Sequence, residues 1–483
     1  MNSKKEYALL GLLILGFALV YLSLCFNNNI WTDEAFTIDL LKSSKSYMDA
    51  VWFTAGDVHP PLYYLILKPF TDLFGVRLFL LKVLSIVPML CTMGLGMTFV
   101  QRRFGFRTAF LYILMLGAIP CAMEYAVQVR MYSWAMLFVT ACAFAAADAC
   151  DRGKKKDWCI FALAGVAAAY THYFAFVAVL WIYGFFFLAL VCKRREKLKY
   201  FLIAAAASLA AYVPWLRVLY AQVSGVRKNY WIAGIDKEVL LSYFDTLFET
   251  ELPYSTPIMV LLFGTAFVWL VYRLVSCKKT KAAKAGQQAE AGGRMPAQTQ
   301  KEVLALLAFS VPVLTAGFGV TVSLLMRPVF IARYIMPCVP LLCFFFAAAW
   351  SEASKKVYAA LLVFTFFLGT IVYQDTWQVE YKSTYVPQTE QFFAENLGEN
   401  DIIVYNFEIF DFIYAYYFDE DKLVYIEDVD LSQDYDNIWL MDTHGQPEFE
   451  ADELAEYGWT KTFMGNYGIE HDEFKIYRIT KNN

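Results

Sequence analysis

Two stretches near the N-terminus, residues 7–26 (YALLGLLILGFALVYLSLCF) and residues 31–64 (WTDEAFTIDLLKSSKSYMDAVWFTAGDVHPPLYY), set the pattern for the whole chain. The first is uncharged and has the length that a helix needs to cross a bilayer. The second begins with Asp33-Glu34 and ends with His59-Pro60-Pro61 and an aromatic cluster. Carboxylates and an imidazole against a membrane are costly, so a functional site is the first hypothesis for this loop. An ordinary solvated loop is the alternative.

Apolar runs of this length recur up to about residue 374. The chain of 483 residues is 59% hydrophobic with a mean hydropathy of +0.43, whereas soluble domains are about 45–50% apolar. The first run is too long for a cleavable signal and is expected to remain as an anchor. We predict a polytopic α-helical membrane protein with about eleven spans. These are Tyr7–Phe26, Leu78–Val100, Thr108–Met123, Tyr132–Cys150, Trp158–Thr171, Phe174–Cys192, Tyr200–Leu219, Thr256–Val275, Val303–Leu325, Val329–Trp350 and Val357–Tyr373.

The positions of Lys and Arg predict the orientation of these spans. Short cytoplasmic loops carry an excess of basic residues, and a cytoplasmic N-terminus places every basic loop on that side. These loops are 101–107, 151–157, 193–199, the polar linker 278–302, and 351–356. Residues 27–77 then form an outer loop. Within it, Pro60–Phe74 is apolar but short and contains Lys68 and Asp72, and a crossing there would move every later basic loop outside, so this segment is expected to lie at the interface. Val239–Glu249 is expected to be a second outer helix.

The last part of the chain, residues 375–483, has a different composition. It holds 25 acidic and 6 basic residues, whereas residues 1–374 hold 20 and 35, so the net charges are −19 and +15. Such a split indicates two environments rather than nucleic acid binding. All ten cysteines precede residue 375, which leaves no disulfide framework or structural zinc site there. We predict an extracytoplasmic α/β domain with strands at Ile402–Tyr405, Leu423–Ile426, Ile438–Met441, Thr460–Met464 and Phe474–Ile479, and helices at Gln388–Asn396, Ile409–Phe418 and Glu453–Tyr457.

On this topology the polar residues of the membrane part gather on the outer side. They come from four different loops, which predicts an outer polar cavity. The members are Asp33, Glu34 and His59 in the first loop, Gln128, Arg130 and Tyr132 in the second, His172 in the third, and Arg327, Arg333 and Tyr334 in the last.

These residue types suit the transfer of a group from a phosphate to a hydroxyl. A carboxylate can accept the hydroxyl proton, and arginines offer a planar fork to a phosphate leaving group. Histidines can donate to phosphate or hold a divalent cation beside a carboxylate. For single residues a structural role is the alternative: Arg130 and Arg333 as snorkelling arginines and His172 as a satisfied core histidine.

The ordered set DEA (33–35), HPPLYY (59–64), RMYS (130–133), THYF (171–174) and RY (333–334) resembles the GT-C superfamily. Over Met1 to about Gln374 the chain is similar to family-39-type integral-membrane glycosyltransferases, the group of the protein O-mannosyltransferases and the lipid A aminoarabinose transferase. The resemblance implies inverting transfer of a hexose or pentose from a polyprenyl-phosphate donor on the outer face of the cell membrane. The acceptor hydroxyl, on a protein, a lipid or an envelope polymer, is left open.

The resemblance also implies roles for the site residues. Asp33 matches the catalytic base and Glu34 supports it, while Arg130, His172, Arg333 and Tyr334 match the donor-phosphate site. His59, Gln128 and Tyr132 fall at positions of the acceptor or cation site. A divalent cation held by Glu34 and His59 is one alternative, and no cofactor is the other. Related sequences often carry an acid where this chain has Gln128, which weakens the case for a metal.

Other functions stay open at this point. A polymerase or ligase of similar architecture would use a lipid diphosphate donor. A transporter or flippase would show internal repeats and broken helices in matching halves, and no such symmetry is visible. A catalytically inactive sensor is a further alternative. The acidic domain, 375–483, has no counterpart in the resemblance.

Overall fold

The computed structural model describes residues 3–26, 29–228, 232, 234–250, 252–284, 297–381, 385–407, 411–443, 445–469 and 472–482. By their internal contacts the residues form two compact units. The first consists of Met1–Phe26 and Ser44–Thr376, and the second of Asn27–Ser43 and Trp377–Asn483. Each unit is considered by itself.

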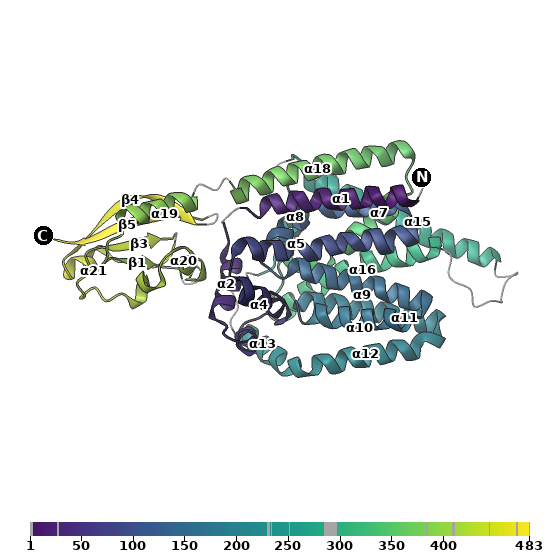
Figure 1. Ribbon diagram of the computed structural model, residues 1–483, viewed down its shortest axis with the longest axis horizontal. Helices are drawn as coiled ribbons and strands as arrows, with labels where there is room; N and C mark the ends of the chain where they lie inside the picture. Colours follow the sequence, from purple (N-terminus) through teal and green to yellow (C-terminus); the bar gives the residue numbers. More distant parts are fainter. Residues whose placement is uncertain are drawn as a thin grey trace. The chain divides into compact units, whose positions relative to one another are not determined.

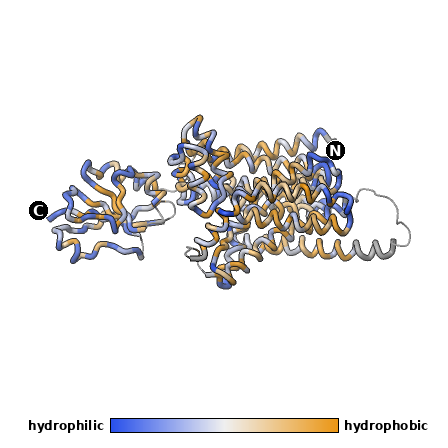
Figure 2. The backbone as a smooth tube through the Cα atoms, turned by 90° about the horizontal axis from the view of Figure 1, so that it is seen from below, coloured by the Kyte–Doolittle hydropathy of each residue, from blue (hydrophilic) through white to orange (hydrophobic). Residues whose placement is uncertain are grey.

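The first unit is a helical bundle (Figure 1), whose long helices run side by side. Figure 2 shows hydrophobic residues along these helices and hydrophilic residues gathered at their ends. Its helices are α1 (Ser3–Leu24), α3 (Tyr47–Gly56), α4 (Leu62–Phe74), α5 (Leu78–Leu95), α6 (Gln101–Phe104), α7 (Phe106–Ala118), α8 (Pro120–Val127), α9 (Tyr132–Arg152), α10 (Lys155–Ala169), α11 (Tyr173–Lys193), α12 (Leu198–Tyr212), α13 (Leu216–Lys228), α14 (Lys237–Phe248), α15 (Ser255–Lys284), α16 (Ala297–Leu325), α17 (Val339–Trp350) and α18 (Lys355–Tyr381).

Within the described ranges, nine helices are long and apolar enough to cross a membrane, and ten if α7 and α8 form one broken span. α7 and α8 meet at a bend of 67°, because Pro120 lacks a backbone donor and holds Ile119 in an extended conformation. The remaining expected span is α10, which has 15 residues and is therefore only about 22 Å long. It packs against α9, α11 and α12. The multi-span membrane architecture is thus confirmed.

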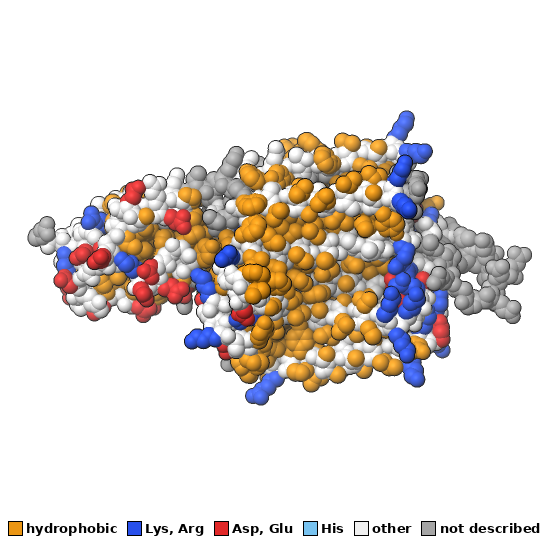
Figure 3. Space-filling view, viewed as in Figure 1, with side chains coloured by type: hydrophobic (Ala, Val, Ile, Leu, Met, Phe, Trp, Pro, Cys, Tyr) orange, Lys and Arg blue, Asp and Glu red, His pale blue; other side chains and the backbone are white. Residues whose placement is uncertain are grey.

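Four of the loops predicted to be cytoplasmic, 101–107, 151–157, 193–199 and 351–356, are joined by side-chain contacts at one end of this bundle, where Figure 3 shows a group of basic side chains. Asp148 is nearly buried and accepts hydrogen bonds from Arg102 (2.7 Å), Arg103 (2.5 Å) and Arg152. Lys197 donates to the backbone carbonyls of Cys150 and Asp151, at 2.7 and 2.9 Å. The arginines therefore have structural partners, and which side of the membrane this end faces stays a prediction.

Two of the shorter expected helices are present. α4 covers most of Pro60–Phe74 and follows Pro61, which suits a helix start. Its Lys68 is buried and pairs with Asp72 one turn later. α14 corresponds to Val239–Glu249 and begins at Asp236, whose carboxylate accepts from the Val239 amide at 2.8 Å. Residues 285–296 of the expected linker, 278–302, lie outside the described residues.

The second unit contains a five-stranded sheet in the order β2-β1-β3-β5-β4. β1 is parallel to β2 and β3, whereas β5 is antiparallel to β3 and β4. The elements are α2 (Thr32–Ser43), α19 (Tyr385–Asn396), β1 (Ile402–Tyr405), α20 (Asp411–Tyr417), β2 (Leu423–Tyr425), β3 (Ile438–Asp442), α21 (Ala451–Glu456), β4 (Trp459–Ile469) and β5 (Asp472–Lys481).

Every residue of β1 is buried, because the sheet is covered on both faces. Ile402 and Val404 join one core cluster with Leu454 and Trp459. On the other face, Trp439 of β3 meets Phe392 of α19 with ring centroids 5.4 Å apart. The α/β character predicted for residues 375–483 is confirmed.

Candidate active site

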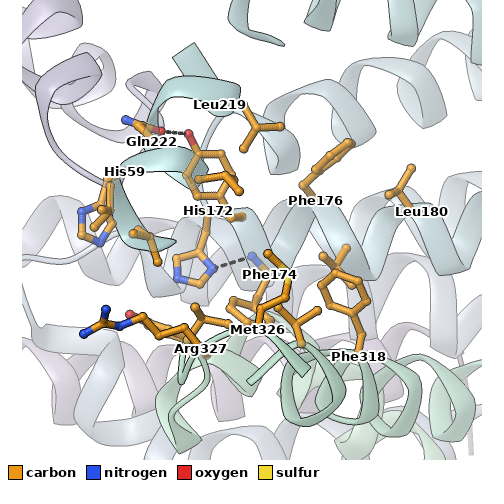
Figure 4. Close-up of a pocket in the computed structure, with 18 residues that line it drawn as sticks. His59, His172, Phe174, Phe176, Leu180, Leu219, Gln222, Phe318, Met326 and Arg327 are labelled. Carbon is orange, nitrogen blue, oxygen red and sulfur yellow. Dashed lines mark hydrogen bonds between the residues drawn. The ribbon is translucent and has the colours of Figure 1, made fainter. Parts of the chain in front are cut away.

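A cavity of about 400 Å³ opens between α11, α13 and α16 in the first unit. Figure 4 shows His59, His172 and the guanidinium of Arg327 at one end of it and Phe176, Leu180 and Phe318 at the other. Leu180 is half exposed on the outside of the bundle, so the apolar end opens where lipid would lie. The cavity therefore has a polar end joined to an apolar channel.

A chain of three polar side chains, Asp57, His59 and Arg130, leads to the polar end. His59 Nδ1 lies 2.5 Å from Asp57 Oδ2, and His59 Nε2 lies 3.3 Å from Arg130 Nη2. Arginine can only donate, so in neutral His59 Nε2 is the acceptor and Nδ1–H donates to Asp57. The carboxylate therefore selects the tautomer and orients the ring toward Arg130.

Arg130 is 2% exposed and lies in the short turn between α8 and α9. α8 ends at Val127 and is followed by Gln128 in an extended conformation, and the Arg130 amide donates to the Gln128 carbonyl at 2.8 Å. The Gln128 side chain is also buried and donates to Glu124 Oε1 at 3.1 Å. A carboxylate is thus present beside this turn, although it belongs to Glu124, one helical turn before the position where related sequences often carry an acid.

His172 caps the N-terminus of α11 and faces the cavity. Its Nδ1 accepts from the Phe174 amide at 3.2 Å, so in the neutral ring the proton is on Nε2. Tyr132 and Tyr334 flank the ring, with centroids 5.5 and 5.3 Å away. Tyr334 also stacks on Phe174 at 5.0 Å. The imidazole is therefore held in one orientation by a cap and an aromatic cage.

A hydrogen-bonded group of side chains joins α3, α11 and α13 behind the polar end. Gln222 donates to the Thr54 carbonyl at 2.8 Å and accepts from the Tyr173 hydroxyl. Trp215 donates to the same hydroxyl at 3.0 Å. These contacts fix the end of α3, which leads directly into Asp57 and His59.

The electrostatics of the polar end keep His172 neutral and Asp57 charged. Burial lowers the pKa of His172 well below its ordinary 6.5, and the electrostatic effects of His59, Arg130 and Arg333 lower it further. Burial alone would raise the pKa of Asp57, but its hydrogen bond to His59 and the nearby positive charges outweigh burial and lower it. Arg130 and Arg333 therefore lie near a neutral imidazole, an arrangement that can bind an anion.

Replacement of His172 by Asn is expected to make stability less sensitive to acid. In the unfolded chain His172 takes up a proton near pH 6.5, whereas the folded protein resists it. The free energy of unfolding therefore falls as the pH drops below 6.5, by up to about 1.4 kcal/mol per unit. Asn keeps the cap acceptor but does not titrate. Melting temperatures between pH 7 and 5 should fall less in His172→Asn than in the parent. Asp57 does not interfere in this range, because its hydrogen bond to His59 lowers the pKa of a carboxyl that is ordinarily already ionised there. Equal slopes would contradict a neutral His172.

Asp33 and Glu34 belong to the second unit, in the first turn of α2. Glu34 is 2% exposed, and its Oε2 accepts from the Trp31 amide at 3.2 Å. Asp33 is half-buried. The two acids thus differ in burial, and the backbone contact gives the carboxylate of Glu34 a structural task.

α2 packs against α20 of the same unit. Phe36 and Phe412 meet edge to face with centroids 5.4 Å apart, and the Ile30 amide donates to the Tyr417 hydroxyl at 3.1 Å. Lys42 lies 5.7 Å from the ring of Tyr416. The acidic pair is therefore carried on a helix that the α/β domain supports.

Phe412→Ala is expected to loosen α2 without unfolding the sheet. The substitution removes one aromatic partner of Phe36, which contributes about 0.5–1.5 kcal/mol beyond the area it buries. Hydrogen exchange in residues 32–43 should accelerate while β1 and β3 remain protected. Phe463→Ala, at an exposed ring on β4, is the control. Unchanged exchange in α2 would show that α20 does not hold this helix.

The side chains around His59 do not favour a bound metal ion. Both ring nitrogens of His59 have partners, Asp57 and Arg130. In the part of the chain that the structure describes, no three His, Cys, Asp or Glu side chains are grouped as a metal site. The cation expected at Glu34 and His59 stays a hypothesis, and no step below uses it.

The structure brings together many of the expected residues. His59, His172, Arg327 and Tyr334 line one cavity, Arg130 contacts His59, and Tyr132 flanks His172. Gln128 instead pairs with Glu124. Sequence reasoning missed Asp57, Glu124 and Gln222. The spacing of Asp57, two residues before His59, was a usable signal, whereas Gln222 lies on a distant helix and gave none.

The chain is similar in fold to a protein of known structure. Two structures of ArnT from Cupriavidus metallidurans match the chain, one in the apo state and one bound to undecaprenyl phosphate. The match to the apo structure has a TM-score of 0.60 at 11% sequence identity. It covers 97% of this chain and 98% of the ArnT chain. The lipid-bound structure has a TM-score of 0.53 at 13% identity, with coverages of 96% and 97%.

A family description also matches part of the sequence. Residues 58–217 match the family of dolichyl-phosphate-mannose-protein mannosyltransferases, and this range contains His59, Arg130 and His172. No curated protein matches the chain. The family match and the shared fold together support a glycosyltransferase of the GT-C superfamily, as the resemblance in the sequence implied.

Proposed function

We propose that this protein transfers a sugar from a polyprenyl-phosphate donor to a hydroxyl acceptor on the outer face of the membrane. The cavity of the first unit carries the proposal. It presents His59, His172 and Arg327 at one end and an apolar channel toward Leu180 at the other. A lipid-linked phosphate has the same division into an anionic head and an apolar chain. The related fold of ArnT, solved with undecaprenyl phosphate, supports the same ligand class.

The proposed reaction is a single displacement. The acceptor oxygen forms a bond to the anomeric carbon of the sugar as the bond from that carbon to the phosphate oxygen breaks. Asp33 accepts the hydroxyl proton, and polyprenyl phosphate leaves with an additional negative charge. Because only one displacement occurs, the configuration at the anomeric carbon is inverted.

Roles for the first unit follow from charge and donors. Arg130 and Arg333 stabilise the charge that develops on the leaving phosphate. His172, neutral and with its proton on Nε2, donates a hydrogen bond to a phosphate oxygen without adding charge. Tyr334 and Tyr132 hold the imidazole. His59 positions Arg130, since Asp57 fixes the ring that the guanidinium contacts.

Binding of polyprenyl phosphate to the purified protein tests this assignment. We expect the lipid to raise the melting temperature of the parent, because a ligand that binds only the folded state stabilises it. Val177→Trp would fill the channel and abolish the increase. Leu163→Trp adds the same ring on an exposed site of α10 and should retain it. Full stabilisation of Val177→Trp would place the lipid elsewhere.

The acceptor is identified by comparison of cells with and without the protein. Mass spectrometry of envelope glycans, lipids and glycoproteins should find one class that lacks a single sugar when the gene is deleted. Loss of the sugar from a secreted or surface class supports the outer face. Loss from a class confined to the cytoplasm would contradict the proposed orientation.

A further inference from the structure

A second cavity of the first unit, of about 390 Å³, lies at the basic end of the bundle. Its walls come from α9, α11 and α16. His172 precedes α11 and lines the candidate active site, whereas Lys193 ends α11 and lines the second cavity. The polar ends of the two cavities are therefore about 30 Å apart, although their apolar walls approach each other at Leu180 and Phe185. The two polar ends therefore lie too far apart to share one head group.

The lining of this second cavity changes from polar to apolar along the helices. At the bundle end it contains Asp151, Lys193, Arg194 and Gln300, and farther in it contains Phe185 and Leu306. Eight residues of α11 separate Phe185 from Lys193, which corresponds to about 12 Å. Leu188, also in the lining, is 64% exposed. The cavity is therefore an amphipathic groove that opens on the surface facing lipid.

The charge at the mouth of the groove is positive. Arg103 is engaged by Asp148 at 2.5 Å and Asp151 at 3.3 Å, so these acids are matched by internal cations. Lys193 is exposed and Arg194 is partly exposed, and both line the groove. Arg194 also lies 3.8 Å from Glu196, which is largely in solvent. Lys193 and Arg194 are thus placed to meet an anion from the bilayer.

We propose that this groove binds an anionic phospholipid. Its phosphate lies between Lys193 and Arg194, and one acyl chain follows α11 toward Phe185. Basic pockets between transmembrane helices bind such head groups in other membrane proteins. The apolar wall of the groove gives the acyl chain a complementary surface. The inference does not depend on the proposed transferase activity, because it concerns the other end of the bundle.

The test measures binding of phosphatidylglycerol to the purified full chain in phosphatidylcholine nanodiscs, by native mass spectrometry and by melting temperature. The parent should retain phosphatidylglycerol and be stabilised by it. Lys193→Gln with Arg194→Gln should weaken this binding about tenfold or more, since both cations lie near the head group. Arg195→Gln with Lys199→Gln removes the same charge from exposed neighbouring positions and should leave binding near the parental level.

Two further variants separate the groove from general surface charge. Ala189→Trp and Leu306→Trp fill it from opposite walls, and either one that folds should lose phosphatidylglycerol. The proposal would be overturned if the two double charge variants lost phosphatidylglycerol binding equally. It would also be overturned if a folded groove-filling variant still bound phosphatidylglycerol fully. Polyprenyl phosphate should stabilise the Lys193 and Arg194 double variant as it does the parent. Loss of that stabilisation would make the groove a site for the polyprenyl lipid instead.

Discussion

Asp33→Asn is expected to lower the rate of sugar transfer by about 100-fold or more, with folding and donor affinity retained. Asn preserves size and hydrogen bonding but cannot accept the proton of the acceptor hydroxyl, and general-base catalysis typically contributes 10²–10⁴-fold. The measurement is the transfer rate of purified protein at saturating donor. Binding of polyprenyl phosphate and the melting temperature report on the retained properties.

Glu34→Gln is the matched control for this prediction. The side chain of Glu34 accepts from the Trp31 amide, and the carbonyl of Gln can accept the same bond. The cost in rate should therefore be much smaller than for Asp33→Asn. If Glu34→Gln abolishes transfer while Asp33→Asn does not, the two roles are reversed. Parental activity in both variants would show that neither acid takes part in the transfer reaction.

Arg130→Lys is expected to reduce transfer by about 10- to 100-fold. An ammonium keeps the charge but lacks the planar fork that contacts a phosphate, and a hydrogen bond to a charged group contributes about 1.5–3 kcal/mol. The loss should appear in the rate of transfer and in donor affinity, because the arginine acts on the phosphate in both states. Arg333→Lys should behave in the same way.

The control for Arg130→Lys separates a functional from a structural arginine. Arg195→Lys, at an exposed position at the other end of the bundle, should be fully active. A structural Arg130 would instead give a variant whose melting temperature falls and whose remaining folded fraction transfers at the parental rate. Full activity of both Arg130→Lys and Arg333→Lys would exclude them from the donor site.

Elements governed by local pattern could be predicted from the sequence. β1 lies at Ile402–Tyr405, as expected from a short β-branched run between polar residues. The gathering of His59, His172 and Tyr334 was also foreseen, because alternating basic loops determined which loops share one end of the bundle. Topology and residue chemistry together were sufficient for this part of the site.

Other features depend on packing that no local pattern reveals. α10 ends at Ala169 and has 15 residues, and the expected span, Trp158–Thr171, was likewise shorter than a bilayer crossing needs; what the short helix packs against could not be predicted. The helix predicted across Pro120 is broken, although the proline was a usable signal. The pairing of Gln128 with Glu124 and of Gln222 with Tyr173 depends on side-chain directions. So does the apolar channel, whose walls come from α11, α13 and α16.

The most direct test of the central claim is turnover of a defined donor by the purified protein. Polyprenyl-phosphate monosaccharides and polyprenyl-diphosphate oligosaccharides are supplied separately with an envelope extract, and the released lipid is identified by mass spectrometry. The account predicts sugar transfer accompanied by release of polyprenyl monophosphate, and loss of both in Asp33→Asn. Release of polyprenyl diphosphate, or movement of lipid-linked sugar between leaflets without any transfer, would contradict it.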